Sequence, residues 1–265
     1  MTTFQTVVLA LIQGLTEFLP VSSSAHLILP SVLLGWPDQG LAFDVVLNFG
    51  TLSAVLIYFR HEISSMSRAW CYSLKSRKQT QDSKLAWWIL FSTIPAAVIG
   101  FLLKDLVATY LRSGYVIAVT TLVFGLLLGW ADSRGTFLKN EYQTGFKGAM
   151  IIGFAQVLAL VPGTSRSGIT ITAALMLGLT REAAARFSFL MSIPIIAMAS
   201  GYNLLQFVLS DQSVNWSGLM LGVVITFFSA ILCIHVFLLI LNKVGMLPFV
   251  IYRIFLSALL FYVLF

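Results

Sequence analysis

Long apolar stretches separated by short polar segments run through the whole chain. A membrane-spanning helix needs roughly 17 to 25 mostly apolar residues to cross the hydrocarbon core. Six stretches meet this requirement: residues 42–60, 85–104, 114–131, 187–209, 217–241 and 247–265. The pattern therefore predicts six transmembrane helices.

Two further apolar stretches are each interrupted by a cluster of small polar residues. The first covers residues 4–19 and 22–34, and the second covers residues 148–161 and 166–178. Each piece has about 12 to 16 residues, and at ~1.5 Å per residue such a helix covers only part of a ~30 Å core. The sequence predicts two re-entrant helix-loop-helix hairpins, each of which returns to the side from which it entered.

The order of these elements repeats along the chain. One hairpin followed by three spans occurs twice, and because three is odd, the second half must begin on the opposite side of the membrane. We expect a single membrane domain, residues 1–265, containing an inverted repeat with halves of about 1–132 and 145–265. The broken helices of such repeats meet near the middle of the bilayer.

The distribution of lysine and arginine supports this topology. Twelve of them fall in one set of alternate loops, two in the other set, and Arg166 and Arg253 lie inside apolar stretches. Since positive residues collect on the cytoplasmic side, the N-terminus, the C-terminus and the mouth of the first hairpin are expected outside. The second hairpin would open towards the cytoplasm. The basic segment at 60–84 is expected to be a solvated cytoplasmic loop.

Spans and composition together place the chain among all-α integral membrane proteins. Hydrophobic residues make up 58% of the sequence, charged residues 10%, and the mean hydropathy is +0.93, whereas a soluble domain carries about 25% charge. The net charge of +6 accompanies no nucleic-acid recognition motif, so no nucleic-acid partner is expected. Two glycine pairs, Gly125 with Gly129 and Gly218 with Gly222, indicate close helix packing within the chain or, alternatively, a homodimer face.

The two polar clusters carry the candidate chemistry. Written from the proline, they read Pro20-Val-Ser-Ser-Ser-Ala-His26 and Pro162-Gly-Thr-Ser-Arg-Ser-Gly168. A charge near the bilayer centre costs at least ~2.5 to 3.5 kcal/mol, so Glu17 and Arg166 are expected to be functional. A purely structural ion pair between them is the alternative. Gln13 lies four residues before Glu17, on the same face of the first half-helix.

Hydroxyl residues dominate both clusters. They are Ser22, Ser23, Ser24, Thr164, Ser165 and Ser167. Such residues cap the helix that follows a break, yet helix N-termini beside hydroxyls and an arginine also bind anions, above all phosphate. Gly163 and Gly168 would permit a tight turn and a close backbone approach. Two such sites facing each other suit a pyrophosphate group.

His26 follows the three serines, where an imidazole can act as general acid or base. The histidines and cysteines do not have the spacing of a zinc site. A single carboxylate together with substrate phosphates is a common way of holding Mg²⁺, which makes Glu17 the candidate metal ligand.

These segments resemble a known family, the membrane-embedded undecaprenyl pyrophosphate phosphatases linked to bacitracin resistance. The resemblance covers most of the chain and is carried by QGLTEFLPVSSSAH (13–26), FDVVLNFGTLSAV (43–55), PGTSRSG (162–168), FSFLMSIP (187–194) and PFVIYR (248–253). The family's (E/Q)xxxE and PGxSRSxxT elements correspond to residues 13–17 and 162–170. Gln13 stands where many relatives have glutamate, which leaves Glu17 as the essential carboxylate.

The resemblance implies removal of the terminal phosphate from undecaprenyl diphosphate, which recycles the lipid carrier of cell-wall synthesis in the bacterial inner membrane. It implies a polyprenyl diphosphate lipid as substrate, a divalent cation, Mg²⁺ or Ca²⁺, and an active site reached from the outer face. The candidate catalytic residues are Glu17, Ser23, His26 and Arg166, and Glu17 is also the candidate metal ligand. The candidate substrate-binding residues are Gln13, Ser22, Ser24, Gly163, Thr164, Ser165, Ser167 and Thr170.

In the mechanism that we expect, Arg166 and the backbone amides of the hairpins hold the diphosphate. Ser23 or an activated water attacks in line, with His26 as the proton-transfer partner. Inverted repeats with broken helices are also characteristic of secondary transporters. The alternative function is therefore transport or flipping of a polyprenyl phosphate.

Overall fold

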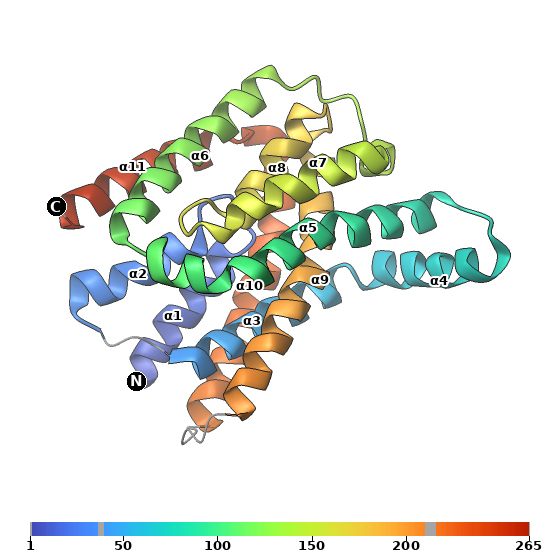
Figure 1. Cartoon of the computed structure of the whole chain (residues 1–265). Helices are drawn as coiled ribbons and strands as arrows, with labels where there is room; N and C mark the ends of the chain where they lie inside the picture. Colours follow the sequence, from blue (N-terminus) through green and yellow to red (C-terminus); the bar gives the residue numbers. More distant parts are fainter. Residues whose placement is uncertain (1, 37–39, 210–215, 265) are drawn as a thin grey trace.

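The computed structural model describes residues 2–36, 40–209 and 216–264, and these residues form a bundle of α-helices without a strand (Figure 1). The first part of the chain contains α1 (Thr3–Thr16), α2 (Ser23–Leu34), α3 (Gly40–Tyr58), α4 (Arg60–Ser76), α5 (Gln81–Tyr110) and α6 (Gly114–Arg134). The second part contains the 3₁₀ turns η1 (Glu141–Gln143) and η2 (Leu158–Leu160), and α7 (Gly145–Val157), α8 (Arg166–Met176), α9 (Arg181–Val208), α10 (Trp216–Val244) and α11 (Leu247–Leu264).

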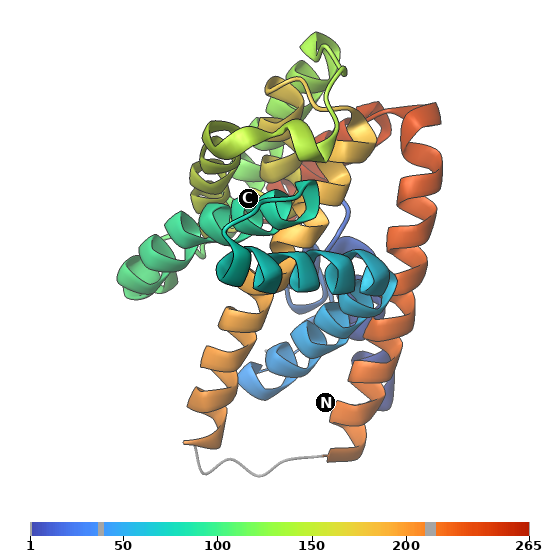
Figure 2. The same ribbon diagram turned by 90° about the vertical axis from the view of Figure 1, so that its right-hand side faces the viewer.

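Five of the described helices are long and apolar enough to cross a membrane: α5, α6, α9, α10 and α11. They coincide with five predicted spans, and α3, with 19 residues, coincides with the sixth. Figure 2 shows α3 between α9 and α10, and it packs against both. Large side chains such as Phe228 and Phe255 are 65% and 70% exposed, as suits lipid-facing positions. The prediction of a helical multi-pass membrane protein is confirmed, and the number of six spans stays a prediction.

Both interrupted stretches form pairs of short helices joined at the predicted polar clusters. The helix α1 ends at Thr16 and α2 begins at Ser23, while η2 ends at Leu160 and α8 begins at Arg166. Figure 1 shows both connections near the centre of the molecule, and α7 and α8 lie side by side. The helices are broken where the sequence predicts it. That each pair returns to the side from which it enters stays a prediction.

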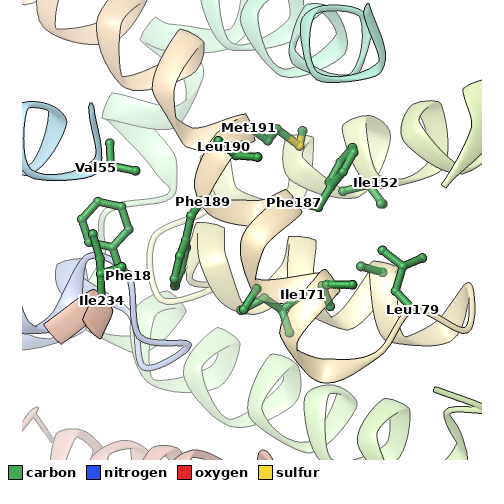
Figure 3. Packing of buried hydrophobic residues seen from close by; sticks show 14 of the residues in the cluster. Phe18, Val55, Ile152, Ile171, Leu179, Phe187, Phe189, Leu190, Met191 and Ile234 are labelled. Carbon is green, nitrogen blue, oxygen red and sulfur yellow. The ribbon is translucent and has the colours of Figure 1, made fainter. Parts of the chain in front are cut away.

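A hydrophobic core around α9 holds the connection between α1 and α2 in place (Figure 3). The buried ring of Phe189 contacts the rings of Phe18, Phe59 and Phe237 at centroid distances of 5.3, 6.4 and 5.8 Å. Aromatic pairs in such arrangements contribute about 0.5–1.5 kcal/mol beyond the burial of their area. Since Phe18 directly follows Glu17, this packing also positions the intramembrane carboxylate.

Most of residues 60–84 form the helix α4, and most of their side chains are exposed, in agreement with the predicted solvated segment. What the sequence analysis does not predict is a helix with one apolar face. Ile63, Met66 and Trp70 are three and four residues apart and share one face of α4. Met66 is buried, and the other two side chains pack against the main core. The many charged and hydroxyl residues of the segment conceal this apolar stripe when the segment is judged by average polarity alone.

The glycine pairs serve helix packing within the chain. A Cβ atom on Gly125 would lie 3.0 Å from the Cβ of Arg253, and one on Gly129 would lie 3.2 Å from the Val250 side chain. Both glycines therefore allow α6 to approach α11 closely, and Gly222 lets α10 approach α3 in the same way. The homodimer stays a prediction.

Candidate functional site

Two loops meet at the centre of the fold: the first loop, residues 17–22 between α1 and α2, and the second loop, residues 161–165 between η2 and α8. The backbone N–H of Gly163 donates to Ser24 Oγ at 3.1 Å, across 139 positions of sequence. Ser167 Oγ donates to the backbone oxygen of Leu19 at 2.8 Å, across 148 positions. The two polar clusters of the sequence therefore form one site.

The two loops enter their helices in the same backbone conformation. Ser22, which precedes α2, has φ 73° and ψ 99°, and Ser165, which precedes α8, has φ 69° and ψ 113°. Each serine hydroxyl lies beside a second one two residues later, Ser22 with Ser24 at 3.1 Å and Ser165 with Ser167 at 3.2 Å. Ser22 therefore corresponds to Ser165. Counting from the prolines pairs Ser22 with Thr164 instead, because two residues lie between Pro162 and Ser165 and only one lies between Pro20 and Ser22.

This correspondence places Ser23 and Arg166 at equivalent positions, the first residue of α2 and of α8. Both side chains contact the same carboxylate. Ser23 Oγ donates to Glu17 Oε2 at 3.0 Å, and Arg166 Nη2 lies 3.3 Å from Glu17 Oε1. The ion pair that the structural alternative requires is thus present. It does not account for the serine hydroxyl on the other carboxylate oxygen.

The two serines that precede the helices share the same strained backbone but differ in capping. A residue other than glycine in the left-handed region costs about 1–3 kcal/mol, and such strain clusters at functional sites. Ser165 Oγ accepts a hydrogen bond from the Gly168 N–H at 3.1 Å, so Ser165 caps α8. The Ser22 side chain makes no capping bond to α2. The capping interpretation of the hydroxyls therefore holds for Ser165 and fails for Ser22.

Two cavities border the carboxylate. The smaller has a volume of about 190 Å³ and is lined by Glu17, Ser22, Ser23, Ser24, Ala159, Val161, Ser165 and Arg166. The larger has a volume of about 480 Å³ and is lined by Gln13, Glu17, Ser23, Ser24, Leu27, Ile28, Ser31, Leu47, Asn48, Arg112, Ile117, Pro162 and Asn203. Glu17, Ser23 and Ser24 belong to both linings, so they separate a small, polar cavity from a larger, partly apolar one.

Two buried polar atoms, in the second loop and at the start of α8, lack an intramolecular partner, and Arg166 is the one of the two residues that lines the smaller cavity. Within the described residues, Thr164 Oγ1 and Arg166 Nε are buried and make no hydrogen bond. Buried polar groups are normally paired, and exceptions often mark a place where a ligand or water supplies the partner. The N-termini of α2 and α8 add positive potential. Such an arrangement can hold an anion.

The comparison with known proteins agrees with this geometry. A family model described as "Bacitracin resistance protein BacA" matches residues 6–259. The chain belongs to the BacA family. It is 58% identical over 258 residues, 97% of either chain, to a protein named "Undecaprenyl-diphosphatase 1" from Pseudoalteromonas translucida (strain TAC 125).

Gln13, in the first motif of this BacA protein, supports the carboxylate as a hydrogen-bond donor. Its Nε2 atom donates to Glu17 Oε2 at 3.0 Å, and its side chain is buried. A glutamate at this position would place a second negative charge on the same helix face. The amide instead leaves Glu17 as the one carboxylate among the residues that line the two cavities.

His26 lies outside the carboxylate cluster and lines neither cavity. Its Nδ1 atom is 2.7 Å from the backbone oxygen of Ser22, and its Nε2 atom is 2.6 Å from the Tyr252 hydroxyl. Nδ1 must therefore carry a proton, because a backbone oxygen can only accept a hydrogen bond, and in the neutral imidazole Nε2 accepts a hydrogen bond from the Tyr252 hydroxyl. Since both nitrogens are engaged away from Ser23, the geometry favours Glu17 over His26 as the group that receives the Ser23 proton.

The remaining candidate residues, Gly163 and Thr170, pack the second loop and α8 against neighbouring helices. Gly163 has φ 90°, and a Cβ atom there would lie 2.5 Å from the Ile117 backbone oxygen. Thr170 lies one turn into α8, where its hydroxyl donates to the Arg166 backbone oxygen at 2.9 Å and lies 2.7 Å from Ser188 Oγ. Thr170 is therefore placed to hold α8 against α9, and it does not line either cavity.

Arg253 of α11 is the residue whose role the sequence does not reveal. It is fully buried, and its guanidinium donates only to backbone oxygens. The acceptors are Pro20 of the first loop at 3.2 Å, Gly163 and Thr164 of the second loop at 3.0 and 3.1 Å, and Thr120 and Thr121 of α6 at 3.4 and 2.9 Å. One side chain thus joins both loops to two long helices.

Asn48, Arg112 and Asn203 line the larger cavity and were also not identified from the sequence. They come from α3, from the connection between α5 and α6, and from α9. Asn48 falls within a segment that carries the family resemblance, and that is the one signal for it in the sequence. Arg112 and Asn203 stand in ordinary polar contexts that point to no site.

The residues at the site fit a divalent cation that is shared with a phosphate ligand. Within the described residues, no group of three or more His, Cys, Asp or Glu side chains could hold a metal ion. Glu17 and the adjacent hydroxyls offer oxygen donors, and Mg²⁺ is commonly bound by one carboxylate together with waters and substrate phosphates. Glu17 is the residue that would hold such an ion.

Proposed function

We propose that this protein hydrolyses undecaprenyl diphosphate to undecaprenyl phosphate and inorganic phosphate. The recycled lipid carrier serves cell-wall synthesis, and its turnover confers resistance to bacitracin. The observation that carries the proposal is the Glu17 carboxylate with Ser23 on one oxygen and Arg166 on the other, between two cavities. The relative named as an undecaprenyl-diphosphatase supports it at 58% identity.

The two cavities bind different parts of the substrate. The terminal phosphate occupies the smaller cavity, where Arg166 and the N-termini of α2 and α8 neutralise its charge. The phosphate attached to the lipid occupies the larger cavity beside Arg112 and Asn48. The first isoprene units contact the apolar part of that lining. Arg166 donates to Glu17 and to the Ser188 backbone oxygen, and its unpaired Nε–H is the group that would bond the phosphate oxygens when the substrate enters.

The chemical step begins at Ser23. Its Oγ attacks the terminal phosphorus while the hydroxyl proton passes to Glu17 Oε2, 3.0 Å away. The bond between that phosphorus and the bridging oxygen breaks, and undecaprenyl phosphate leaves. A water then attacks the phosphoserine, the bond between phosphorus and Ser23 Oγ breaks, Oγ takes up one proton of that water, and inorganic phosphate leaves. Glu17 loses its proton to solvent, which restores both side chains. Direct attack by a water on the diphosphate is the alternative, and it leaves no phosphoserine.

A divalent cation, Mg²⁺ or Ca²⁺, held by Glu17 and the substrate would neutralise the charge that develops on the phosphate oxygens. The Glu17 carboxylate would then both accept the Ser23 proton and hold the cation. Its ion pair with Arg166 orients it before the substrate and the cation bind. His26 and Tyr252 position the Ser22 backbone, and with it the start of α2.

The topology belongs to the same proposal: six spans and two re-entrant hairpins in an inverted repeat. Helix packing supports it, because several contacts between two helices recur between their counterparts in the other half. The counterparts are α1 and α7, α2 and α8, α3 and α9, α5 and α10, and α6 and α11. The helix α1 packs on α10 as α7 packs on α5, α3 contacts α10 as α9 contacts α5, and α2 contacts α11 as α8 contacts α6. With positive residues inside, the protein lies in the bacterial inner membrane and the substrate enters from the outer face.

The decisive experiment measures inorganic phosphate released from undecaprenyl or farnesyl diphosphate by the purified protein, with and without EDTA. Ser23→Ala should lower the rate by about 10²–10⁴-fold, whereas Ser24→Ala should lower it far less, since Ser24 contacts Gly163 and not Glu17. Rapid quenching should trap phosphate on Ser23. Full activity of Ser23→Ala would refute the nucleophile, and no phosphate release by the wild-type protein would refute the function itself and leave transport to be tested.

A further inference from the structure

A third cavity, apart from the two that border Glu17, lies where α4 is followed by α5. Its volume is about 560 Å³, and it is lined by Ser73, Leu74, Arg77, Gln79, Lys84, Trp87, Trp88, Phe91 and Phe146. None of these residues lines the cavities around Glu17. The phosphatase reaction assigns no role to it.

The lining changes from cationic to aromatic along α5. Arg77 and Lys84 lie at one end, and Phe91 lies seven residues, about 10 Å, further along the helix than Lys84. Between them the ring of Trp87 stacks on that of Phe91 with 5.3 Å between centroids. The ring of Phe146, from α7, meets Phe91 edge to face at 5.6 Å. The cavity therefore has a charged mouth and an aromatic wall.

This cavity lies at the end of α5 where the apolar span begins, which is expected at the membrane surface. The apolar span of α5 begins at Gln81, so Lys84 and the two tryptophans lie in its first turns. Tryptophan is enriched at this depth of a bilayer, at the level of the lipid headgroups. The helix α4 is amphipathic and too polar to be a candidate span, which is typical of a helix that lies along the interface.

The charge of this segment is strongly positive. Residues 60–84 contain six Lys and Arg residues and two acidic residues. Basic clusters directly beside a membrane span attract anionic lipids by about 1 kcal/mol per charge. Arg77 and Lys84 differ from the other four basic residues because they line the cavity.

We propose that this cavity binds one anionic phospholipid from the leaflet that faces α4. The headgroup phosphate lies between Arg77 and Lys84, and the upper part of an acyl chain lies against the aromatic wall. Charge complementarity selects an anion, and the apolar wall selects a lipid over a free phosphate ion. The bound lipid joins the hairpin of α4 and α5 to α7 through Phe146.

The test uses the purified full-length protein in nanodiscs that contain brominated lipid, which quenches nearby tryptophan fluorescence. Brominated phosphatidylglycerol at low mole fraction should quench more than brominated phosphatidylcholine at the same fraction. In the double variant Arg77→Gln/Lys84→Gln, which removes two charges, the preference for brominated phosphatidylglycerol should fall about thirtyfold. The matched control Lys75→Gln/Lys78→Gln removes the same charge from exposed residues that do not line the cavity, and it should keep the preference.

Equal loss of preference in both double variants would overturn the proposal in favour of diffuse attraction to the whole basic segment. Equal quenching by the two lipids in the wild-type protein would overturn it as well. Millimolar inorganic phosphate should leave the quenching unchanged, and displacement by phosphate would show that the site binds a free ion. Since fluorescence is measured without substrate, these results do not depend on the phosphatase activity.

Discussion

Replacing Arg253 with methionine tests whether one buried side chain holds the catalytic loops together. Methionine has a similar length and no charge, so the change removes the hydrogen bonds with little change in volume. Five backbone oxygens lose the hydrogen bond from this guanidinium, three of them in the two loops and two in α6. We expect Arg253→Met to be inactive and less stable than the wild-type protein.

The magnitude follows from the burial of these oxygens. A hydrogen bond from a charged donor contributes about 1.5–3 kcal/mol, and an unpaired buried acceptor costs about 1–3 kcal/mol. These terms are not additive, and losing one partner of a buried charged network typically costs about 3–5 kcal/mol. A displacement of about 1 Å at a catalytic group lowers the rate by about 10²-fold. Both the thermal midpoint and kcat should therefore fall.

Two glycines in different helices, Gly168 and Gly201, supply an independent variant and its control. A Cβ atom on Gly168 would lie 2.9 Å from Arg253 Nη1, whereas one on Gly201 of α9 would have no neighbour within 4 Å. Gly168→Ala should therefore displace the guanidinium and lower kcat. Gly201→Ala should keep full activity and unfold at an equal or higher temperature, because alanine favours a helix by about 1 kcal/mol over glycine.

The assay combines phosphate release with thermal unfolding of the protein in detergent micelles. If Arg253→Met retains at least half of the wild-type kcat and an unchanged thermal midpoint, the reasoning is refuted. A variant that folds and unfolds normally but has lost activity would still support the positioning role, because Arg253 lines neither cavity.

Three further variants test separate parts of the site. Glu17→Gln keeps the shape of the side chain and removes its charge, so phosphate release should fall by about 10²–10⁴-fold, and a rate near wild type would contradict its role. Arg112→Gln should raise KM for the lipid diphosphate about tenfold with little change in kcat, whereas Lys104→Gln, outside the cavity, should change neither. At Ser22, with φ 73°, glycine should give a higher thermal midpoint than alanine, and at the exposed, helical Ser64 the order should reverse.

The sequence predicts the helices and the breaks because both depend on local signals. Apolar stretches of full length predict spans, and the same apolar pattern interrupted by Pro20 or Pro162 and several hydroxyls predicts a broken helix. Glu17 and Arg166 could be identified because a charge inside an apolar stretch is costly wherever it lies. The contact between Glu17 and Arg166 then connects the two loops.

The rest could not be predicted because it depends on partners far apart in the chain. Arg253 carries the same signal as Arg166, yet its acceptors are backbone oxygens up to 233 positions away, which no side-chain pattern encodes. The correspondence of Ser22 with Ser165 depends on their φ and ψ angles. His26 stands beside the serines in sequence, but the direction of its ring is set by Tyr252 of α11.

Gln156 of α7 offers a test of how the two halves diverged. Gln13 lies nine positions before Ser22, and Gln156 lies nine positions before Ser165, so the two glutamines correspond. At the position that corresponds to Glu17, the second half of the chain has Leu160. Gln13 donates to Glu17, whereas within the described residues both polar atoms of the buried Gln156 side chain lack a partner. An unpaired buried amide costs about 1–3 kcal/mol. Gln156→Met should therefore raise the thermal midpoint and keep activity, while Gln13→Met should lower activity by removing a donor from the carboxylate. A lower thermal midpoint in Gln156→Met would contradict this reasoning, because it would show that the Gln156 amide has a partner. The second half of the chain would then contain a polar site of its own.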